Sequence, residues 1–240
     1  SKAAPAGRAM EDQPRFPAFR ELRLEDRGLI GPLLWGHQPE TSELTFTNLF
    51  IWRTGYGWQW SIKGDYLLLL SAKPGAEPYL LPPVGPSPRA GLCLELLRWL
   101  RDERGEAEPR IERADPALAL EATQLAALQA EPDRDQSDYV YRTADLIALK
   151  GARYHAKRNH LSRFARSAVA DYAAITEDNL HLCAEFQDRW CQMRRCAEDL
   201  NLLGEWEAVR EVLVHYPRLG LTGGAMLIGV RVEAFSVGER

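Results

Sequence analysis

A dense run of basic side chains is the part of this sequence that most directly suggests chemistry. Residues 139–170 contain seven Lys or Arg residues, two His residues and one acidic residue, Asp145. The preceding residues 102–138 contain eleven acidic residues and four arginines. Concentrated positive charge on a chain whose net charge is -4 favours binding of an anionic partner. The alternative is a solvated surface helix whose charge is neutralised by the acidic segment.

The basic run has the periodicity of a helix over residues 143–167, and each face of that helix has its own composition. One stripe is apolar or small and is expected to pack on the core: Ile147, Gly151, Tyr154, Leu161, Ala165 and Ala168. A second face carries Lys150, Arg153, Lys157 and His160, and a third carries His155, Asn159, Ser162 and Arg166. A phosphate-rich ligand would suit a helix that is basic around most of its exposed circumference.

The two histidines of this run do not have the spacing of metal ligands. His155 and His160 are five residues apart, so on a helix their rings diverge by about 140°. Either histidine could act as an acid or base, because the unperturbed pKa of His is near neutrality, but the sequence shows no partner that would orient it. We therefore predict no metal site.

A second group of candidates lies in an aromatic stretch. Its aromatic side chains could stack bases or line an acyl pocket, although aromatic residues at such spacing are more typical of a core. They are Phe46, Phe50, Trp52, Tyr56, Trp58 and Trp60. Asn48 and Arg53 are the better ligand-binding candidates here, since burying either side chain requires a polar partner.

Several catalytic motifs are absent from the sequence. It has no Gly-x-Ser-x-Gly, no His-Glu-x-x-His, no Walker-type glycine loop followed by Lys, and no Gly-x-Gly-x-x-Gly after a strand. Serine hydrolase, zinc protease, P-loop and dinucleotide-binding functions therefore lack support. What remains is transfer chemistry that relies on positioning a bound activated donor, or simple binding.

Composition indicates a globular, cytoplasmic protein. The 240 residues are 45% hydrophobic, enough for a real core, and no apolar run approaches the roughly 18 residues that a membrane helix needs. The four cysteines, too few and too irregular for a disulfide scaffold, are expected to be reduced thiols. Residues 1–15 have the character of a flexible leader rather than a secretion signal.

Alternating side chains predict a β-hairpin over residues 57–71. Trp58, Trp60 and Ile62 alternate with polar residues, as in a strand that buries one face. Gly64 and the following Asp supply a turn, and the apolar run after it supplies the second strand. Other expected strands are 19–26, 110–113, 172–175, 225–230 and 231–237. Expected helices are 27–36 with Pro32 in its first turn, 92–103, 116–128, about 179–200 with Thr176 as N-cap, and 206–216 stopped by Pro217.

The polar residues 131–138 predict a boundary between an N-terminal domain of residues 16–134 and a C-terminal domain of residues 138–240. A hairpin at the end of the chain would leave an uncovered edge strand. We therefore expect the second domain to be incomplete here and the native protein to continue.

These segments resemble a known family. Residues 138–164, residues 42–53 and the stretch from Gly224 to Gly229 are similar to soluble bacterial proteins of uncharacterised function that are related to the C-terminal catalytic domain of phosphatidylglycerol lysyltransferase. The resemblance implies an α+β fold of two tandem acetyltransferase-like (GNAT) domains, each a twisted mixed sheet flanked by helices.

The resemblance also implies a donor and a set of ligand contacts. The lysyltransferase relatives use an aminoacyl-tRNA donor and a membrane lipid acceptor, so the basic helix is expected to meet RNA or lipid phosphate. The resemblance implies that six residues of this sequence contact the ligand: Lys150, Arg153, Lys157, Arg158, Asn159 and His160. Acyl-CoA is the other donor considered, but the acyl-CoA loop pattern is absent because Arg53-Thr-Gly-Tyr-Gly is one residue too short.

Two functional hypotheses follow. The first is an acyl- or aminoacyltransferase-like protein that moves an activated group to an amine or hydroxyl acceptor. The second is a non-catalytic module that binds RNA, a nucleotide or an anionic phospholipid headgroup through the basic helix.

Overall fold

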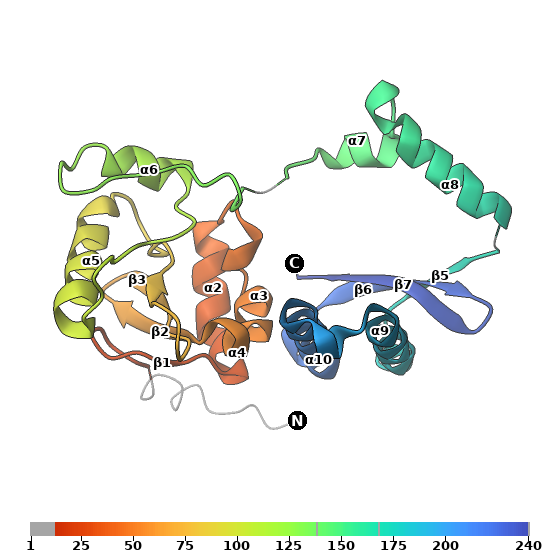
Figure 1. Ribbon diagram of the computed structural model, residues 1–240, viewed down its shortest axis with the longest axis horizontal. Helices are drawn as coiled ribbons and strands as arrows, with labels where there is room; N and C mark the ends of the chain where they lie inside the picture. Colours follow the sequence, from red (N-terminus) through yellow and green to blue (C-terminus); the bar gives the residue numbers. More distant parts are fainter. Residues whose placement is uncertain (1–12, 138, 168, 240) are drawn as a thin grey trace. The chain divides into compact units, whose positions relative to one another are not determined.

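The computed structural model describes residues 13–137, 139–167 and 169–239, and the chain forms two compact units that divide between Gln136 and Ser137. Each unit contains one antiparallel sheet together with helices (Figure 1). The α+β prediction is therefore confirmed. The tandem acetyltransferase-like topology stays a prediction.

The first unit is built on a four-stranded sheet whose central hairpin matches the sequence prediction. Trp60 pairs with Leu69 and Lys63 pairs with Tyr66 across that hairpin, and Gly64 in its turn has a φ of 58°. The four leucines at 67–70 are no more than 1% exposed, so this strand is buried on both faces. In spatial order the strands are β1 (Arg20–Glu21), β2 (Trp58–Lys63), β3 (Tyr66–Ser71) and β4 (Tyr79–Leu80).

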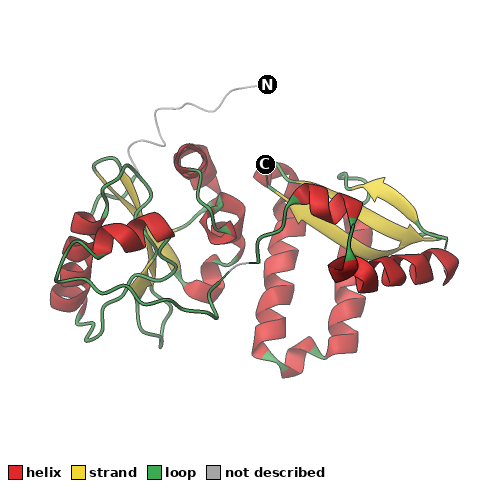
Figure 2. Cartoon of the chain, turned by 90° about the horizontal axis from the view of Figure 1, so that it is seen from above, coloured by secondary structure: helices red, strands yellow, loops and turns green. Residues whose placement is uncertain are grey.

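Helices cover both faces of this sheet (Figure 1, Figure 2). The predicted helix at 92–103 is confirmed as α5 (Ala90–Arg104), whose Leu96 and Leu100 pack with Leu68, Leu70 and Leu80. The helices on the other face are α2 (Arg27–His37), α3 (Phe46–Ile51) and α4 (Arg53–Tyr56). A further helix, α6, spans Pro116–Ala122.

Asp26 fixes the first strand and the first helix to the sheet. Its carboxylate accepts two hydrogen bonds from Arg20, at 2.8 and 2.6 Å, and one from the backbone N–H of Arg23 at 2.8 Å. The indole N–H of Trp60 donates to the same carboxylate at 3.0 Å. Asp26 is buried, and these donors compensate for the removal of its charge from water.

Several predicted elements in the first unit are shorter than expected. Residues 19–26 contribute only the two-residue β1 and a 3-10 turn at Leu24–Asp26, because Asp26 draws the chain back toward Arg23. Pro32 lies inside α2 rather than in its first turn. The predicted strand at 110–113 forms one bridge, from Ile111 to Leu80, and the predicted helix at 116–128 ends at Ala122.

The second unit has a three-stranded antiparallel sheet packed against two helices. Phe186 and Phe235 lie with ring centroids 5.9 Å apart, and the Arg189 guanidinium donates to the Val232 carbonyl at 2.7 Å. A Cβ at Gly224 would collide with the Tyr172 ring, so the close approach of that ring requires glycine. The strands are β5 (Asp171–Ala174), β6 (Thr222–Ile228) and β7 (Arg231–Gly238), and the helices are α9 (Leu180–Arg194) and α10 (Leu200–Leu219).

The three strands predicted in the second unit are confirmed, although β6 begins three residues earlier and ends two residues earlier than the predicted 225–230. The helix boundaries differ more. Thr176 is not the N-cap; Asn179 occupies that position and its side-chain oxygen accepts from the Thr176 backbone N–H at 2.9 Å. Helix α9 ends at Arg194, and α10 continues through Pro217 to Leu219. The predicted reduced state is wrong for two of the cysteines, because Cys191 and Cys196 form a disulfide bond.

Within the part of the chain that the structure describes, no helix is both long enough and apolar enough to cross a bilayer.

Candidate functional site: a basic helical arm

The basic run forms two helices that meet at an elbow instead of one continuous helix. Helix α7 spans Thr143–Ala148, and α8 spans His155–Ser167 after a 3-10 turn at Ala152–Tyr154 (Figure 1). Leu149 at the elbow has a φ of 46° and Gly151 a φ of 90°, which a regular helix does not allow. We call residues 143–167 the basic arm.

Arg158 holds this elbow closed. Its Nη1 donates to the carbonyl oxygens of Leu149 and Gly151, the latter at 2.8 Å. These carbonyls lie where α7 ends, and a guanidinium is a suitable donor to such unpaired acceptors. Arg158 thus has a structural role in addition to the ligand contact predicted for it.

The predicted packing of the apolar stripe is wrong. Ile147 is 80% exposed and Leu161 is 57% exposed, and Gly151 and Ala165 are exposed as well. Tyr154, at 4% exposure, is the buried one among the stripe residues that the structure describes, and Ala168 lies outside them. Leu161 and Ala165 share one side of α8, but the elbow separates them from Ile147 and Gly151, and spacing alone does not show what covers a helix face.

Most of the arm's positive charge faces solvent. Arg153 forms an ion pair with Asp145 at 2.6 Å, with both side chains substantially exposed. Among the described residues, no ion pair involves four exposed bases of the arm: Lys150, Lys157, Arg163 and Arg166. Neutralisation of the arm by the acidic residues 131–138 stays a prediction.

The remaining predicted ligand contacts on α8 are also exposed. Asn159 Nδ2 and His155 Nε2 are 3.0 Å apart, one helical turn from each other, and His160 is exposed on the following turn. A phosphate group could approach these side chains and Lys157 without displacing any part of the fold. The arm thus presents amide, imidazole and ammonium groups at an exposed surface.

Asn48 and Arg53 belong to the first unit, whereas the arm belongs to the second. Asn48 is half-buried in α3, where its backbone N–H completes the N-cap by donating to Thr45 Oγ1 at 3.2 Å. Arg53 donates to the Phe50 carbonyl at 2.7 Å, and its guanidinium lies 3.9 Å from the centre of the Phe50 ring. These contacts give Arg53 partners within its own segment.

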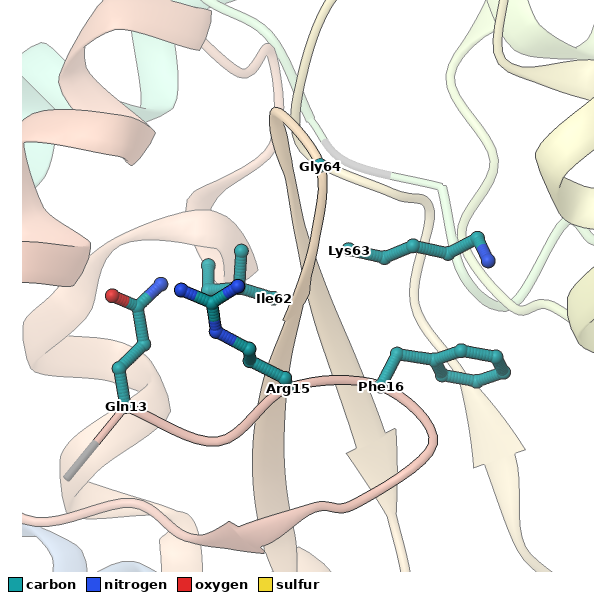
Figure 3. A pocket seen from close by; sticks show the side chains of 6 residues that line it. All are labelled: Gln13, Arg15, Phe16, Ile62, Lys63 and Gly64. Carbon is teal, nitrogen blue, oxygen red and sulfur yellow. The ribbon is translucent and has the colours of Figure 1, made fainter. Parts of the chain in front are cut away.

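A pocket of about 350 Å³ lies at the tip of the β2–β3 hairpin (Figure 3). Figure 3 shows Gln13 and Arg15 pointing toward each other at this pocket. The Lys63 ammonium is paired with Glu95 at 2.8 Å. None of the predicted ligand-binding residues lines the pocket. The sequence did not reveal this pocket, because the two segments that form it are distant along the chain. The lining residues are Gln13, Arg15, Phe16, Ile62, Lys63 and Gly64.

Sequence reasoning also missed a buried polar cluster in the first unit. Arg89, 3% exposed, donates to both carboxylate oxygens of Asp115 at 2.8 Å. Burial raises the pKa of Asp115, but the Leu118 backbone N–H and Arg89 together hold that pKa below its ordinary value. Burial, followed by the charge of Arg89, lowers the pKa of His37.

This cluster is a structural anchor rather than a reaction centre. Burial raises the pKa of the neighbouring Cys93 thiol to about 11, so the sulfur stays protonated and is a poor nucleophile near neutral pH. Asp115 also caps α6, because its carboxylate accepts from the Leu118 N–H at 2.9 Å. The hydrogen-bonding groups of Arg89 and Asp115 therefore bond to other groups of the first unit and stabilise its fold.

Comparison with known proteins places these features in context. A family model described as phosphatidylglycerol lysyltransferase, C-terminal, matches residues 37–240. A crystal structure of a conserved protein of unknown function from Bacteroides thetaiotaomicron VPI-5482 is similar, with 27% identity and a TM-score of 0.79 over 92% of this chain and 74% of that chain. No curated protein matches the chain.

Proposed function

The chain belongs to the phosphatidylglycerol lysyltransferase C-terminal family, a family of transferase domains, and from this premise we propose that it moves an activated acyl or aminoacyl group to an amine or hydroxyl acceptor. The observation that carries the proposal is the exposed positive charge of the basic arm, where Lys150, Lys157, Arg163 and Arg166 form no ion pair within the described residues. Such a surface attracts a phosphate-bearing substrate.

We propose aminoacyl-tRNA as the donor in preference to acyl-CoA. The loop that would hold coenzyme A is not recognisable in the sequence, whereas a chain of RNA phosphates matches several bases spread along the elbow and α8. On this proposal, the bases of the arm position the donor and are not themselves reactive.

The reaction would be a direct transfer between two bound substrates. The acceptor nitrogen or oxygen attacks the carbonyl carbon of the activated ester and forms a new bond to it, and the ester oxygen of the donor leaves as a hydroxyl after gaining a proton. The acceptor loses its proton in the same exchange. The protein would contribute orientation and stabilisation of the negative charge that develops on the carbonyl oxygen.

The test is a transfer assay with purified protein and two labelled donors, aminoacyl-tRNA and acyl-CoA. We expect label to leave the aminoacyl-tRNA for an amine or hydroxyl acceptor. Substitution of Lys157→Gln should raise the KM for the donor with little change in kcat, because it removes a contact distant from the reacting atoms. It should also lower the slope of log K for donor binding against log salt concentration by about 1, the contribution of one phosphate contact.

Arg101→Gln is a matched control, since Arg101 is also an exposed base on a helix, but on α5 in the first unit. It should leave the KM unchanged. Absence of transfer from both donors, under conditions in which the donors remain intact, would contradict the proposed activity.

A second function, binding without turnover, is favoured by one observation. The arm presents Lys150, Lys157, Arg163 and Arg166 at an exposed surface. For a binding module, the same assay should show salt-sensitive association with tRNA and no release of label.

A further inference from the structure

A disulfide bond closes the short connection between α9 and α10 in the second unit. Helix α9 ends at Arg194, and Arg195 follows in the left-handed conformation with a φ of 52°. The chain then forms a 3-10 turn at Cys196–Glu198 before α10 begins. The bond joins Cys191, in the last turn of α9, to Cys196, the first residue of the 3-10 turn. We call residues 195–199 the corner.

Backbone caps hold the two sides of the corner without help from the sulfur atoms. On the α9 side, the Arg195 N–H donates to the Gln192 carbonyl at 3.3 Å. On the α10 side, the Asp199 carboxylate accepts from the N–H groups of Asn201 and Leu202 at 2.9 and 3.3 Å. Because these caps do not involve cysteine, the chain can keep its path through the corner when the disulfide is reduced.

The disulfide is poorly placed to act as a scaffold for the whole unit. Cys191 and Cys196 are five residues apart in the sequence. A disulfide stabilises a protein mainly by restricting the unfolded chain, and the effect grows with the length of the loop that it closes. A loop this short restricts little of the unfolded chain. The bond therefore acts on the conformation of the corner more than on the stability of the unit.

The two sulfur atoms differ in their access to solvent. Cys196 is 1% exposed, whereas Cys191 is half-buried and the residues between them are exposed. A dissolved thiol can therefore approach the bond from the Cys191 side. Arg194 and Arg195 lie between the two cysteines, and positive charge beside a cysteine favours the thiolate, which is its reactive form. Glu198 offsets part of this charge, because it forms an ion pair with Arg195 at 3.7 Å.

The other two of the four cysteines are protected from thiol chemistry. Cys93 is 3% exposed and Cys183 is fully buried. Burial raises the pKa of both thiols, that of Cys93 to about 11. Buried and protonated thiols are inert toward oxidants and disulfides. The reactive sulfur of this chain is thus confined to the corner.

We propose that Cys191 and Cys196 form a reversible redox pair that controls how tightly the first turn of α10 is held to α9. The proposal goes beyond the proposed function and does not rest on it. In the oxidised state, the disulfide ties the corner to the last turn of α9. In the reduced state only the caps hold it, and the neighbouring hydrogen bond between the helices, from the Trp206 indole to Asp188 at 3.2 Å, opens more often.

Reduction of the pair is a thiol–disulfide exchange. The thiolate of a low-molecular-weight thiol attacks Cys191 Sγ and forms a mixed disulfide with it, while Cys196 leaves as a thiolate and takes up a proton. A second small thiol attacks the external sulfur of the mixed disulfide and releases Cys191 as a thiol. The protein gains two electrons and two protons, and the two small thiols become one disulfide. Oxidation is the reverse, with a low-molecular-weight disulfide as the oxidant.

The test is equilibration of the whole folded protein in buffers with different ratios of reduced to oxidised glutathione, followed by alkylation with N-ethylmaleimide and mass spectrometry. We expect the bond between Cys191 and Cys196 to open and re-form across the series, with Cys93 and Cys183 unmodified. Hydrogen exchange at residues 196–206 should be about tenfold faster in the reduced form. Exchange in β6 and β7 should not change.

Substitutions separate the effect of the bond from a general effect of the reductant. Cys191→Ala and Cys196→Ala should each exchange rapidly at residues 196–206 in every buffer, as the reduced protein does. Cys93→Ala is the matched control, since Cys93 is a buried cysteine of the first unit. It should keep the full redox response of the corner. The unsubstituted protein reports both states, so the test does not depend on the folding of any variant.

Four results would overturn the proposal. The first is a bond that opens only when urea unfolds the second unit, and the second is reduction that itself unfolds that unit, since either result indicates a scaffold. The third is absence of the bond in every buffer, and the fourth is equal hydrogen exchange at residues 196–206 in the two states. None of these results bears on transfer from aminoacyl-tRNA, which the separate transfer assay decides.

Discussion

Asp26 and Asp115 each join segments of the first unit that are distant in the sequence. Asp26 accepts from Trp60, 34 residues away, and Asp115 accepts from Arg89, 26 residues away. Neither aspartate stood out in the sequence, because a single carboxylate gives no sign of which donors the folded chain brings to it. At this scale, the structure adds information that residue type and spacing do not contain.

Asp26→Asn should destabilise the first unit by about 2–3 kcal/mol, because the Arg20 guanidinium would lose its charged acceptor. Urea unfolding at neutral pH measures the change. Asp65→Asn is the control, since Asp65 is exposed in the hairpin turn, and its effect should stay within about 0.5 kcal/mol. Equal stability of the two variants would show that the Asp26 contacts contribute little.

The lowered pKa of Asp115 predicts a pH dependence of stability. Its pKa in the folded protein is below the ordinary value of 3.8, so the unfolded chain binds this proton more tightly. The ion pair with Arg89 therefore stabilises the fold above that value, and the stabilisation is lost as the pH falls through it toward the folded pKa.

The difference in urea midpoint between the unsubstituted protein and Asp115→Asn should accordingly be constant from neutral pH to about pH 5 and shrink below about pH 4. A difference that grows on acidification would have the wrong sign for a lowered pKa.

Secondary-structure elements were predictable where two signals agreed. The β2–β3 hairpin combined alternating side chains with a Gly-Asp turn, and α5 combined a helical apolar face with a glycine after its end. The basic arm had periodicity without a boundary signal strong enough to reveal the elbow at Leu149–Gly151. The exposure of the arm's apolar residues was not predictable, because burial depends on which other elements pack against a helix, and periodicity does not show that.

The elbow gives a test at the scale of the element. Gly151→Ala places a side chain at a φ of 90°, a conformation that L-residues rarely adopt, and should destabilise the arm by about 1–3 kcal/mol. Hydrogen exchange should show faster exchange of α8 amides. The contrasting variant is Gly28→Ala in α2, where an added Cβ meets nothing within 4 Å; it should stabilise its unit by about 0.5–1 kcal/mol.

For the whole molecule, the division between Gln136 and Ser137 predicts where a protease cuts first. Residues 131–137 are exposed and contain no helix or strand, in contrast to the bases of α8. Brief trypsin treatment should cleave after Arg134 and leave two stable fragments, because local unfolding limits cleavage elsewhere. Mass spectrometry identifies the site.

Arg134→Gln should slow that first cut. If trypsin instead cleaves the variant within α8 as fast as it cleaves the unsubstituted protein after Arg134, the arm is less ordered than the contacts of Arg158 indicate.

The four consecutive leucines of β3 do not determine its pairing register, so the residues at the two ends of the strand must do so. Because each leucine is buried whichever way it points, a shift by one residue would exchange identical side chains and meet little resistance from the interior. The Tyr66 hydroxyl bonded to the Pro86 carbonyl at 2.9 Å, and Ser71 Oγ bonded to the Tyr56 carbonyl at 2.8 Å, oppose such slippage. Misaligned isomers should therefore accumulate on refolding when both polar termini are replaced by leucine.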